Sequence, residues 1–269
     1  MHQLVRFVKW LAVLGMVLAV LYVVGIPLLQ PPELSVAPAA LDEAPQESEA
    51  SLPDGLLAHR LAYQFDERTG SVVVYALTND AFATRVFYDA APRFVSAWGG
   101  GADRVVINGG FFHEDYSPSG FLIAEGERIG VRQFDEARSG VVVVRDGTVS
   151  IEERVPAFSD SADADDGAIQ SFPFLVRAGH AAVSEDSGLL SRRSAIGTDA
   201  NGTVYLIFAQ RGNISLYELA QTLAASEFPF DTVLNLDGGP SSGLYVQVDE
   251  YADVQDSLSG VPSVLVFER

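Results

Sequence analysis

Short runs of β-branched and aromatic residues, separated by Gly, Asp and Asn, fill the chain from about Leu56 onward and restrict it to a fold built on sheets. Such runs predict strands at Ser71–Leu77, Arg104–Asn108, Gly140–Arg145 and Thr203–Ala209. Val141–Val144 is apolar throughout rather than alternating, which predicts a sheet covered on both faces.

Helical patterns are few. Ser215 and Glu218 form a capping box at the start of a helix predicted to run to about Ser226, with an apolar face along it. A weaker pattern predicts a second helix at Pro92–Trp98, ended by the glycines 99–101. Because a regular alternation of strand and helix is missing, we expect an α+β class: a single domain of mixed or antiparallel sheet with few helices.

The N-terminal region carries a different signal. Trp10–Leu29 is an uncharged, Leu- and Val-rich run long enough to cross a membrane as a helix. Arg6 and Lys9 precede it and no further Lys or Arg occurs before Arg60, so the positive-inside rule places the domain outside the cytoplasm. The alternative is a signal peptide cleaved near Ala37–Ala39, which would also export the domain.

These patterns divide the chain into four parts. Residues 1–9 form a short cytoplasmic N-terminus, and residues 10–29 form a transmembrane anchor or an uncleaved signal. Residues 30–55 are rich in proline and acids and are expected to be a disordered linker. Residues 56–269 form the folded domain. We therefore expect a membrane-anchored protein whose domain is extracytoplasmic, in the periplasm or at the cell surface.

The charge and the cysteine content exclude several classes of function. A formal net charge of −19 argues against nucleic acid as a partner, because binding to phosphates requires clustered Lys and Arg. The absence of cysteine excludes disulfides, zinc-thiolate sites and cysteine nucleophiles. No dinucleotide fingerprint and no metal-ligand spacing is present, so neither a cofactor nor a metal is predicted. The acidic segment 160–167 is expected to be a solvated loop.

The first candidate site segment follows the predicted strand at 104–108. Asn108 ends this strand and is followed by Gly109, Gly110 and Phe111. Paired glycines permit close backbone approach, and their N–H groups can form a concave set of donors for a sugar hydroxyl or a phosphate oxygen. The alternative interpretation is a simple turn between strand and loop.

The second candidate segment is 235–242. Asn235 and Asp237 are two residues apart, so on a strand both side chains point to the same face, with Ser241 and Ser242 close by. An Asp-Gly hairpin turn is the alternative, although a hairpin does not need this many polar groups. Residues 239–243 also match a nucleophile-elbow pattern, but the histidines are His2, His59, His113 and His180, so none follows Ser241 and a serine triad is rejected.

Two arginines are the candidate anion ligands in this acidic domain. Arg193 and Arg211 can each hold a pair of phosphate oxygens through a planar guanidinium, whereas Arg192 is interpreted as a surface charge.

The blocks Asn108–Phe112, Gly120, Arg193–Gly197, Ser215–Leu219 and Asn235–Ser242, in this order, resemble the phosphodiester glycosidase family over most of 56–269. The segment Gln170–Val176 is similar to a glycine-richer family segment, from which Phe172 departs. Pro240 stands where many members have a third glycine, which leaves the substrate open.

The resemblance implies hydrolysis of a sugar-1-phosphodiester in a glycan, at the sugar C1–oxygen bond. It gives Asp237 the role of base or nucleophile, with Arg193 and Arg211 on the phosphate. The implied substrate-binding residues are Asn108, Gly109, Gly110, Phe111, Gln170, Asn235, Gly238, Gly239, Ser241 and Ser242. Two alternatives stay open: an ordinary glycoside hydrolase that pairs Asp237 with Glu114 or Asp115, and a non-catalytic glycan-binding or assembly protein of the envelope. The oligomeric state is not predicted.

Overall fold

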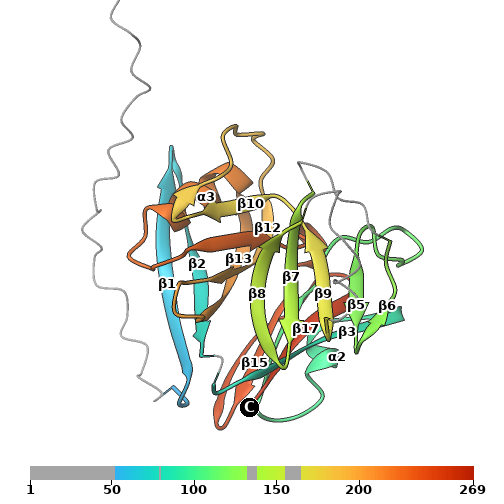
Figure 1. Cartoon of the computed structure of the whole chain (residues 1–269). Coiled ribbons are helices and arrows are strands. Elements are labelled where there is room, and N and C mark those ends of the chain that lie inside the picture. The colour runs from blue at the N-terminus through green and yellow to red at the C-terminus, as the bar shows by residue number, and fades with distance from the viewer. Residues whose placement is uncertain (1–51, 79, 132–137, 155–164) are drawn as a thin grey trace, which may run out of the picture. The chain divides into compact units, whose positions relative to one another are not determined.

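The structure is a computed structural model that describes residues 52–78, 80–131, 138–154 and 165–269 (Figure 1). The predicted cytoplasmic segment and anchor, and nearly all of the linker, lie outside the described residues. Within the described ranges, no helix has both the length and the apolar character needed to cross a membrane.

Three sheets make up the described domain (Figure 1). The seven-stranded sheet has the order β1 (Leu56–Phe65), β2 (Arg68–Leu77), β13 (Val204–Ile214), β12 (Ser191–Thr198), β14 (Thr232–Asn235), β10 (Phe174–Arg177), β11 (His180–Ala181). One five-stranded sheet has the order β16 (Tyr251–Gln255), β15 (Leu244–Val248), β4 (Arg104–Asn108), β17 (Val261–Glu268), β3 (Ala83–Arg93). The other has the order β6 (Glu127–Arg128), β5 (Leu122–Ala124), β9 (Gly167–Ser171), β7 (Gly140–Arg145), β8 (Thr148–Glu153).

Every strand pairing in the described residues is antiparallel, so of the two predicted kinds of sheet the antiparallel one is present. The prediction for Val141–Val144 is confirmed, because all four side chains in β7 are buried. Val142 faces the central core and Val143 a second apolar cluster, which explains why the strand does not alternate.

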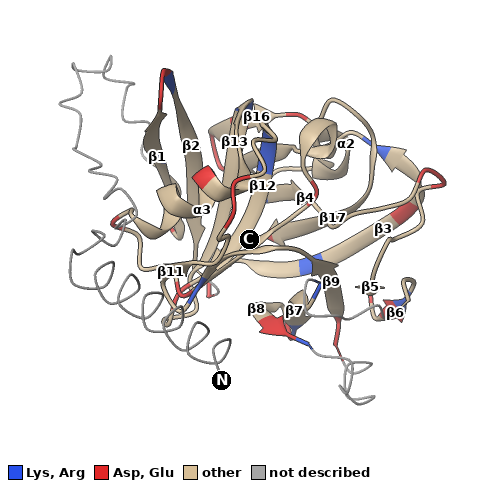
Figure 2. Cartoon of the chain, turned by 90° about the horizontal axis from the view of Figure 1, so that it is seen from above, with Lys and Arg blue, Asp and Glu red and all other residues tan. Residues whose placement is uncertain are grey.

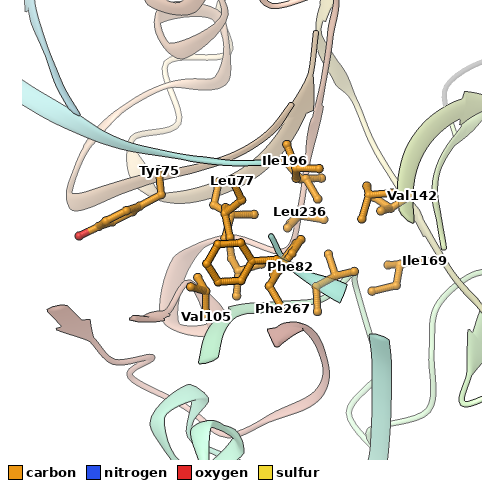
Figure 3. Close-up of a cluster of buried hydrophobic side chains, with 14 of the residues drawn as sticks. Tyr75, Leu77, Phe82, Val105, Val142, Ile169, Ile196, Leu236 and Phe267 are labelled. Atoms are coloured by element: carbon orange, nitrogen blue, oxygen red, sulfur yellow. The ribbon is translucent and has the colours of Figure 1, made fainter. Parts of the chain in front are cut away.

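The central core lies between the sheets. Side chains from all three sheets meet there, including Ile196, Leu236, Val142, Ile169 and Phe267 (Figure 3). The opposite face of the seven-stranded sheet is covered by the helix α3 (Leu216–Ala224). This packing leaves the strand ends of β4 and β14 to continue into the loops that carry the two candidate segments.

The capped helix is confirmed. The Ser215 side chain accepts a hydrogen bond from the Glu218 N–H, and the Glu218 carboxylate accepts one from the Ser215 N–H at 2.9 Å. Arg68 on β2 forms an ion pair with Glu218, which ties the start of the helix to the sheet. The second helix, α2 (Val95–Gly99), is shorter than predicted, because Pro92 and Arg93 belong to β3, where Arg93 pairs with Val261 of β17.

The prediction of a solvated loop at 160–167 is wrong at its described end. Asp165 is buried and accepts hydrogen bonds from Arg154 at 2.8 Å and Arg145 at 2.7 Å, and Gly167 begins the buried strand β9. A carboxylate can be buried here because two guanidiniums compensate its charge.

Replacing Ser215 by Ala removes one half of the capping box, and we expect it to lower the free energy of unfolding by about 1 kcal/mol. Urea denaturation measures this change. The matched control is Ser184→Ala, an exposed serine in the loop before β12, which we expect to cost less than about 0.5 kcal/mol. Equal effects of the two substitutions would contradict a stabilising role for the box.

Candidate active site

A single buried amide holds the two candidate segments together. Asn108 is fully buried at the end of β4, and its Nδ2 donates to the carbonyl oxygens of Asp237 at 2.8 Å and Gly109 at 3.2 Å. Its Oδ1 accepts a hydrogen bond from the Gly243 N–H at 3.1 Å. The Asp237 N–H in turn donates to the Gly109 carbonyl at 3.1 Å. The segments around Asn108 and Asp237 therefore lie side by side, although they are far apart in the sequence.

The register of β12 with β14, extended two residues beyond its last pair, brings the backbone of Arg193 level with that of Asp237. Ala195 is paired with Asn235, and the Leu236 N–H donates to the Ser194 carbonyl at 2.9 Å, so the register continues beyond the end of β14. Residues directly opposite in an antiparallel pair carry their side chains on the same face. The register thus puts the guanidinium-bearing side chain on the face predicted for Asn235 and Asp237, and a Cβ on Gly238 would be 3.6 Å from Arg193 Nη1.

Asp237 lies in a half-buried position with few partners for its charge. Its Oδ1 accepts a hydrogen bond from the Gly238 N–H at 2.9 Å, and the Ser241 hydroxyl donates to the same carboxylate. Burial raises the pKa of the Asp237 carboxyl above its ordinary value, and these two hydrogen bonds offset part of the increase. A carboxylate in this environment is more basic than one in water.

Arg193 has hydrogen bonds but no ion pair. Its Nη2 donates to the Leu189 carbonyl at 2.5 Å and its Nε to the Ile214 carbonyl at 3.4 Å. Burial lowers the pKa of Arg193, and among the described residues no carboxylate pairs with it. In a domain with many acids, an arginine held by carbonyls and left without a counter-charge is suited to bind an anion.

Arg192 and Arg211 lie in surroundings that the sequence did not predict. Arg192 is half-buried rather than a surface charge: it lies 5.5 Å from the Phe208 ring centroid and donates to the Asp256 carbonyl at 2.8 Å. Arg211 is exposed, and its charge acts on Tyr63, whose pKa is raised by burial and by Glu218 against the smaller opposing effect of Arg211. In the described part of the chain, no hydrogen bond or ion pair joins Arg211 to the Asp237 loop. Figure 2 shows the arginines of β12 as a blue segment beside mostly uncharged ribbon.

Several buried polar atoms around the site have no partner in the described residues. These are Asn235 Oδ1, Ser242 Oγ and Ser194 Oγ. Asn235 Nδ2 is engaged, because it donates to the Phe172 carbonyl at 2.8 Å. Buried polar groups are rarely left unpaired in proteins, so these atoms are positions for ordered water or for substrate hydroxyls. The sequence reasoning did not select Ser194, although it directly follows Arg193.

The glycines are required mainly by packing. The Gly109 N–H donates to the Ser263 carbonyl at 2.8 Å, and a Cβ there would be 2.3 Å from Ser263 Oγ. A Cβ on Gly110 would be 2.7 Å from the Gln170 carbonyl oxygen. The predicted set of free N–H donors is therefore incomplete, since one of the two is used within the fold. Gly238 and Gly239 form the entry to the short 3₁₀ turn η2 (Gly239–Ser241), where Gly239 has a φ of +63°.

Gln170 and Phe111 line a neighbouring part of the site. Gln170 Oε1 accepts from the Phe121 N–H at 2.7 Å and its Nε2 donates to the Arg138 carbonyl at 2.6 Å, so its amide braces two loops. The ring centroids of Phe111 and Phe172 are 4.6 Å apart. A hollow of about 630 Å³ begins at Phe172 and gives room for a ligand. Its described lining is Phe172, Pro173, Phe174, Arg177, His180, Ala181 and Ala182.

The described residues contain no group of three His, Asp or Glu side chains placed to hold a metal ion.

Comparison with known families shows to which family the chain belongs. Residues 103–268 match the model of the phosphodiester glycosidase family, which is more than half of the chain. The chain belongs to the phosphodiester glycosidase family. The matched range includes Asn108, Arg193 and Asp237, so the resemblance drawn from these blocks of sequence is confirmed.

Solved structures share the phosphodiester glycosidase fold. The zebrafish N-acetylglucosamine-1-phosphodiester alpha-N-acetylglucosaminidase catalytic domain, auto-inhibited by its pro-peptide, is 16% identical with a TM-score of 0.61, and the match covers 82% of this chain and 85% of that one. A hypothetical protein from Synechocystis is also 16% identical, with a TM-score of 0.51 and coverage of 80% and 62%. Comparison with curated proteins gives no match.

Replacing Asn108 by Ala should leave the Asp237 carbonyl and the Gly243 N–H without their partner, while the Gly109 carbonyl keeps its bond from the Asp237 N–H. We expect a loss of about 2–3 kcal/mol in the free energy of unfolding, because buried groups without partners cost about 1–3 kcal/mol. Urea denaturation measures the loss. The exposed Asn201→Ala serves as the control and should change stability by less than about 0.5 kcal/mol. A similarly small effect at Asn108 would show that the amide does not hold the loops.

The raised pKa of Asp237 predicts a cost in stability. Between the ordinary pKa of an aspartate and the raised value the folded protein binds more protons than the unfolded chain, so the Asp237 contribution falls as pH rises. Asp237→Asn removes this cost and keeps the acceptor oxygen. We expect a higher urea midpoint than wild type at neutral pH. The difference should shrink toward about pH 3, where the Asp237 carboxyl of wild type is mostly protonated in both the folded and the unfolded chain.

The control for this comparison is Asp231→Asn, an exposed carboxylate at the start of the same segment, which should change stability by less than about 0.5 kcal/mol. A lower urea midpoint for Asp237→Asn at neutral pH would mean that the charged form is stabilised by the fold, contrary to the direction given by burial.

Proposed function

We propose that this protein is a hydrolase that cleaves the glycosidic bond of a sugar-1-phosphodiester in an envelope or extracellular glycan. The observation that supports the proposal is that Arg193, a half-buried cation without a carboxylate partner in the described residues, lies beside Gly238, the residue that follows Asp237. Arg193 and Asp237 provide one group for a phosphate and one for the sugar carbon. Membership of the phosphodiester glycosidase family supports a glycan substrate.

Asp237 is the base or the nucleophile at C1. As a base, it takes a proton from water while the water oxygen attacks C1; as a nucleophile, its oxygen attacks C1 and water later releases the sugar. In both routes the C1–oxygen bond breaks, its electron pair stays on the phosphate oxygen, and one water is consumed. The products are the free sugar and a phosphate monoester. The raised pKa of Asp237 favours either role near neutral pH.

Arg193 stabilises the charge that develops on the departing phosphate. Its Nη2 and Nε are held by two carbonyls, while Nη1 is the nitrogen next to Gly238, so the guanidinium is already oriented before substrate binds. Because a phosphate monoester leaves readily as an anion, the reaction does not require a strong general acid. Asn235, Ser241 and Ser242 bind sugar hydroxyls or position water, and the hollow at Phe172 receives part of the substrate.

An ordinary glycoside hydrolase mechanism has less support. It needs a second carboxyl that remains protonated near neutral pH. Asp115 is exposed and accepts hydrogen bonds from the Ser117 hydroxyl at 2.6 Å and the Ser117 N–H at 3.0 Å, which lower its pKa. Glu114 is also exposed. Asp115 is therefore held in its charged form and does not supply such an acid.

The proposed site of action is outside the cytoplasm. This part of the proposal rests on the charge asymmetry around Trp10–Leu29, with Arg6 and Lys9 before the apolar run and acids after it. The protein would then be anchored by its N-terminal helix, with the domain facing glycans of the envelope.

The test is incubation of the full chain with a panel of sugar-1-phosphodiesters, with the released sugar identified by mass spectrometry. We expect turnover by wild type and none by Asp237→Asn. We expect Arg193→Gln to lower kcat/KM by about 10²–10³, as for loss of one group that stabilises an anion. The matched control is Arg211→Gln, the exposed arginine, which should have a much smaller effect.

Three results would contradict the proposal. Full activity of the Asp237→Asn protein would remove this residue from the chemistry. Activity on phosphate-free glycosides alone would favour the ordinary glycoside hydrolase. Binding of envelope sugars without any product would favour the non-catalytic glycan-binding protein.

A further inference from the structure

We propose that the group esterified to the far side of the substrate phosphate is an alkyl or lipid chain, which packs on exposed leucines at the rim of the site. This inference rests on the proposed function, because it names the aglycone of the phosphodiester. It adds a binding surface that the catalytic groups themselves do not include.

The leucines are unusual in their exposure. Leu189 is 70% exposed and Leu258 is 69% exposed, which makes them the two most exposed large hydrophobic residues in the described part of the chain. Leu190, next to the first of them, is 42% exposed. Single exposed leucines are common, whereas exposed apolar residues gathered at one place often mark a binding surface.

Both leucine segments border the catalytic loop. The Leu189 carbonyl accepts the hydrogen bond from Arg193 Nη2, so this backbone is in direct contact with the proposed phosphate ligand. The Leu258 N–H donates to the Pro240 carbonyl at 2.7 Å, which attaches the second segment to the turn that follows Asp237. A Cβ on Gly239 would be 3.4 Å from Ser191 Oγ, so the strand that follows Leu190 also reaches this turn.

The position of the leucines suits one part of the substrate. In the proposed mechanism Asp237 acts at the sugar carbon and Arg193 binds the phosphate. Because Arg193 Nη2 donates to the Leu189 carbonyl, an aglycone that leaves the phosphate on this side meets Leu189. A second sugar in that position would need hydrogen-bonding side chains, whereas an alkyl chain gains affinity by covering leucine side chains. Each methylene buried on an apolar surface improves binding by about fourfold.

The test compares two phosphodiesters of one sugar, a methyl ester and a hexyl ester, bound to the full chain in lipid nanodiscs. Dissociation constants are measured with the Asp237→Asn protein, so that no turnover interferes. We expect the hexyl ester to bind about tenfold more tightly or better. Adding Leu189→Ser and Leu258→Ser should bring the two dissociation constants close together. Both positions are exposed, so these changes should not unfold the protein.

Two control proteins separate the rim from other effects. Leu57→Ser changes a 57% exposed leucine on β1, at the far edge of the seven-stranded sheet, and should keep the wild-type preference. Leu189→Met with Leu258→Met keeps an apolar rim and should keep it as well. Partition of the hexyl ester into the nanodisc lipid is the same for every protein, so only differences between proteins decide the result.

Equal affinity for the two esters, or a preference that persists after both Ser substitutions, would overturn the lipid aglycone. Release of sugar by the wild-type protein is measured in parallel. A hexyl preference that depends on the leucines, without any sugar release, would disprove the proposed hydrolysis while the apolar rim stands. Failure of both esters to bind would disprove both proposals.

Discussion

The active site depends on the hydrogen bonds of one amide. Asn108 contributes two donors and one acceptor to backbone groups of Gly109, Asp237 and Gly243. Only an amide side chain offers both donors and an acceptor in this arrangement, and burial prevents water from replacing it. The position of Asp237 relative to β4, and therefore the existence of a shared site, follows from these bonds.

The second constraint is electrostatic. Removing a carboxylate or a guanidinium from water is unfavourable unless a partner of opposite charge compensates it. Elsewhere in the domain that partner is present, as for Asp165 with its two arginines or Glu218 with Arg68. Neither Asp237 nor Arg193 has such a partner in the described residues. Burial raises the pKa of Asp237 and lowers the pKa of Arg193, so it favours the uncharged form of each group. Uncompensated groups of this kind are typical of sites that are stabilised by their ligand.

The sheets explain why such a site can persist. β12 lies between β13 and β14 in the seven-stranded sheet, and α3 covers one face while the central core covers the other. Arg193 is thus part of a rigid element, near the start of β12. Leu189 and Leu258 of the proposed apolar rim lie on loops outside this rigid part. Substitutions in these loops can change substrate preference without disturbing the core.

The sequence alone determined the local features. Runs of β-branched residues, the capping box at Ser215 and the apolar run in β7 depend on neighbours within a few residues, and the blocks around Asn108 and Asp237 sufficed to identify the family. Only the tertiary structure decided which polar groups are used within the fold and which are left to bind a ligand. Gly109 uses its N–H within the fold, Arg192 is half-buried and Arg211 is exposed, because each outcome depends on pairing between strands distant in the chain. Local sequence does not specify which distant strand becomes the neighbour, as for β2 beside β13 or β14 beside β10.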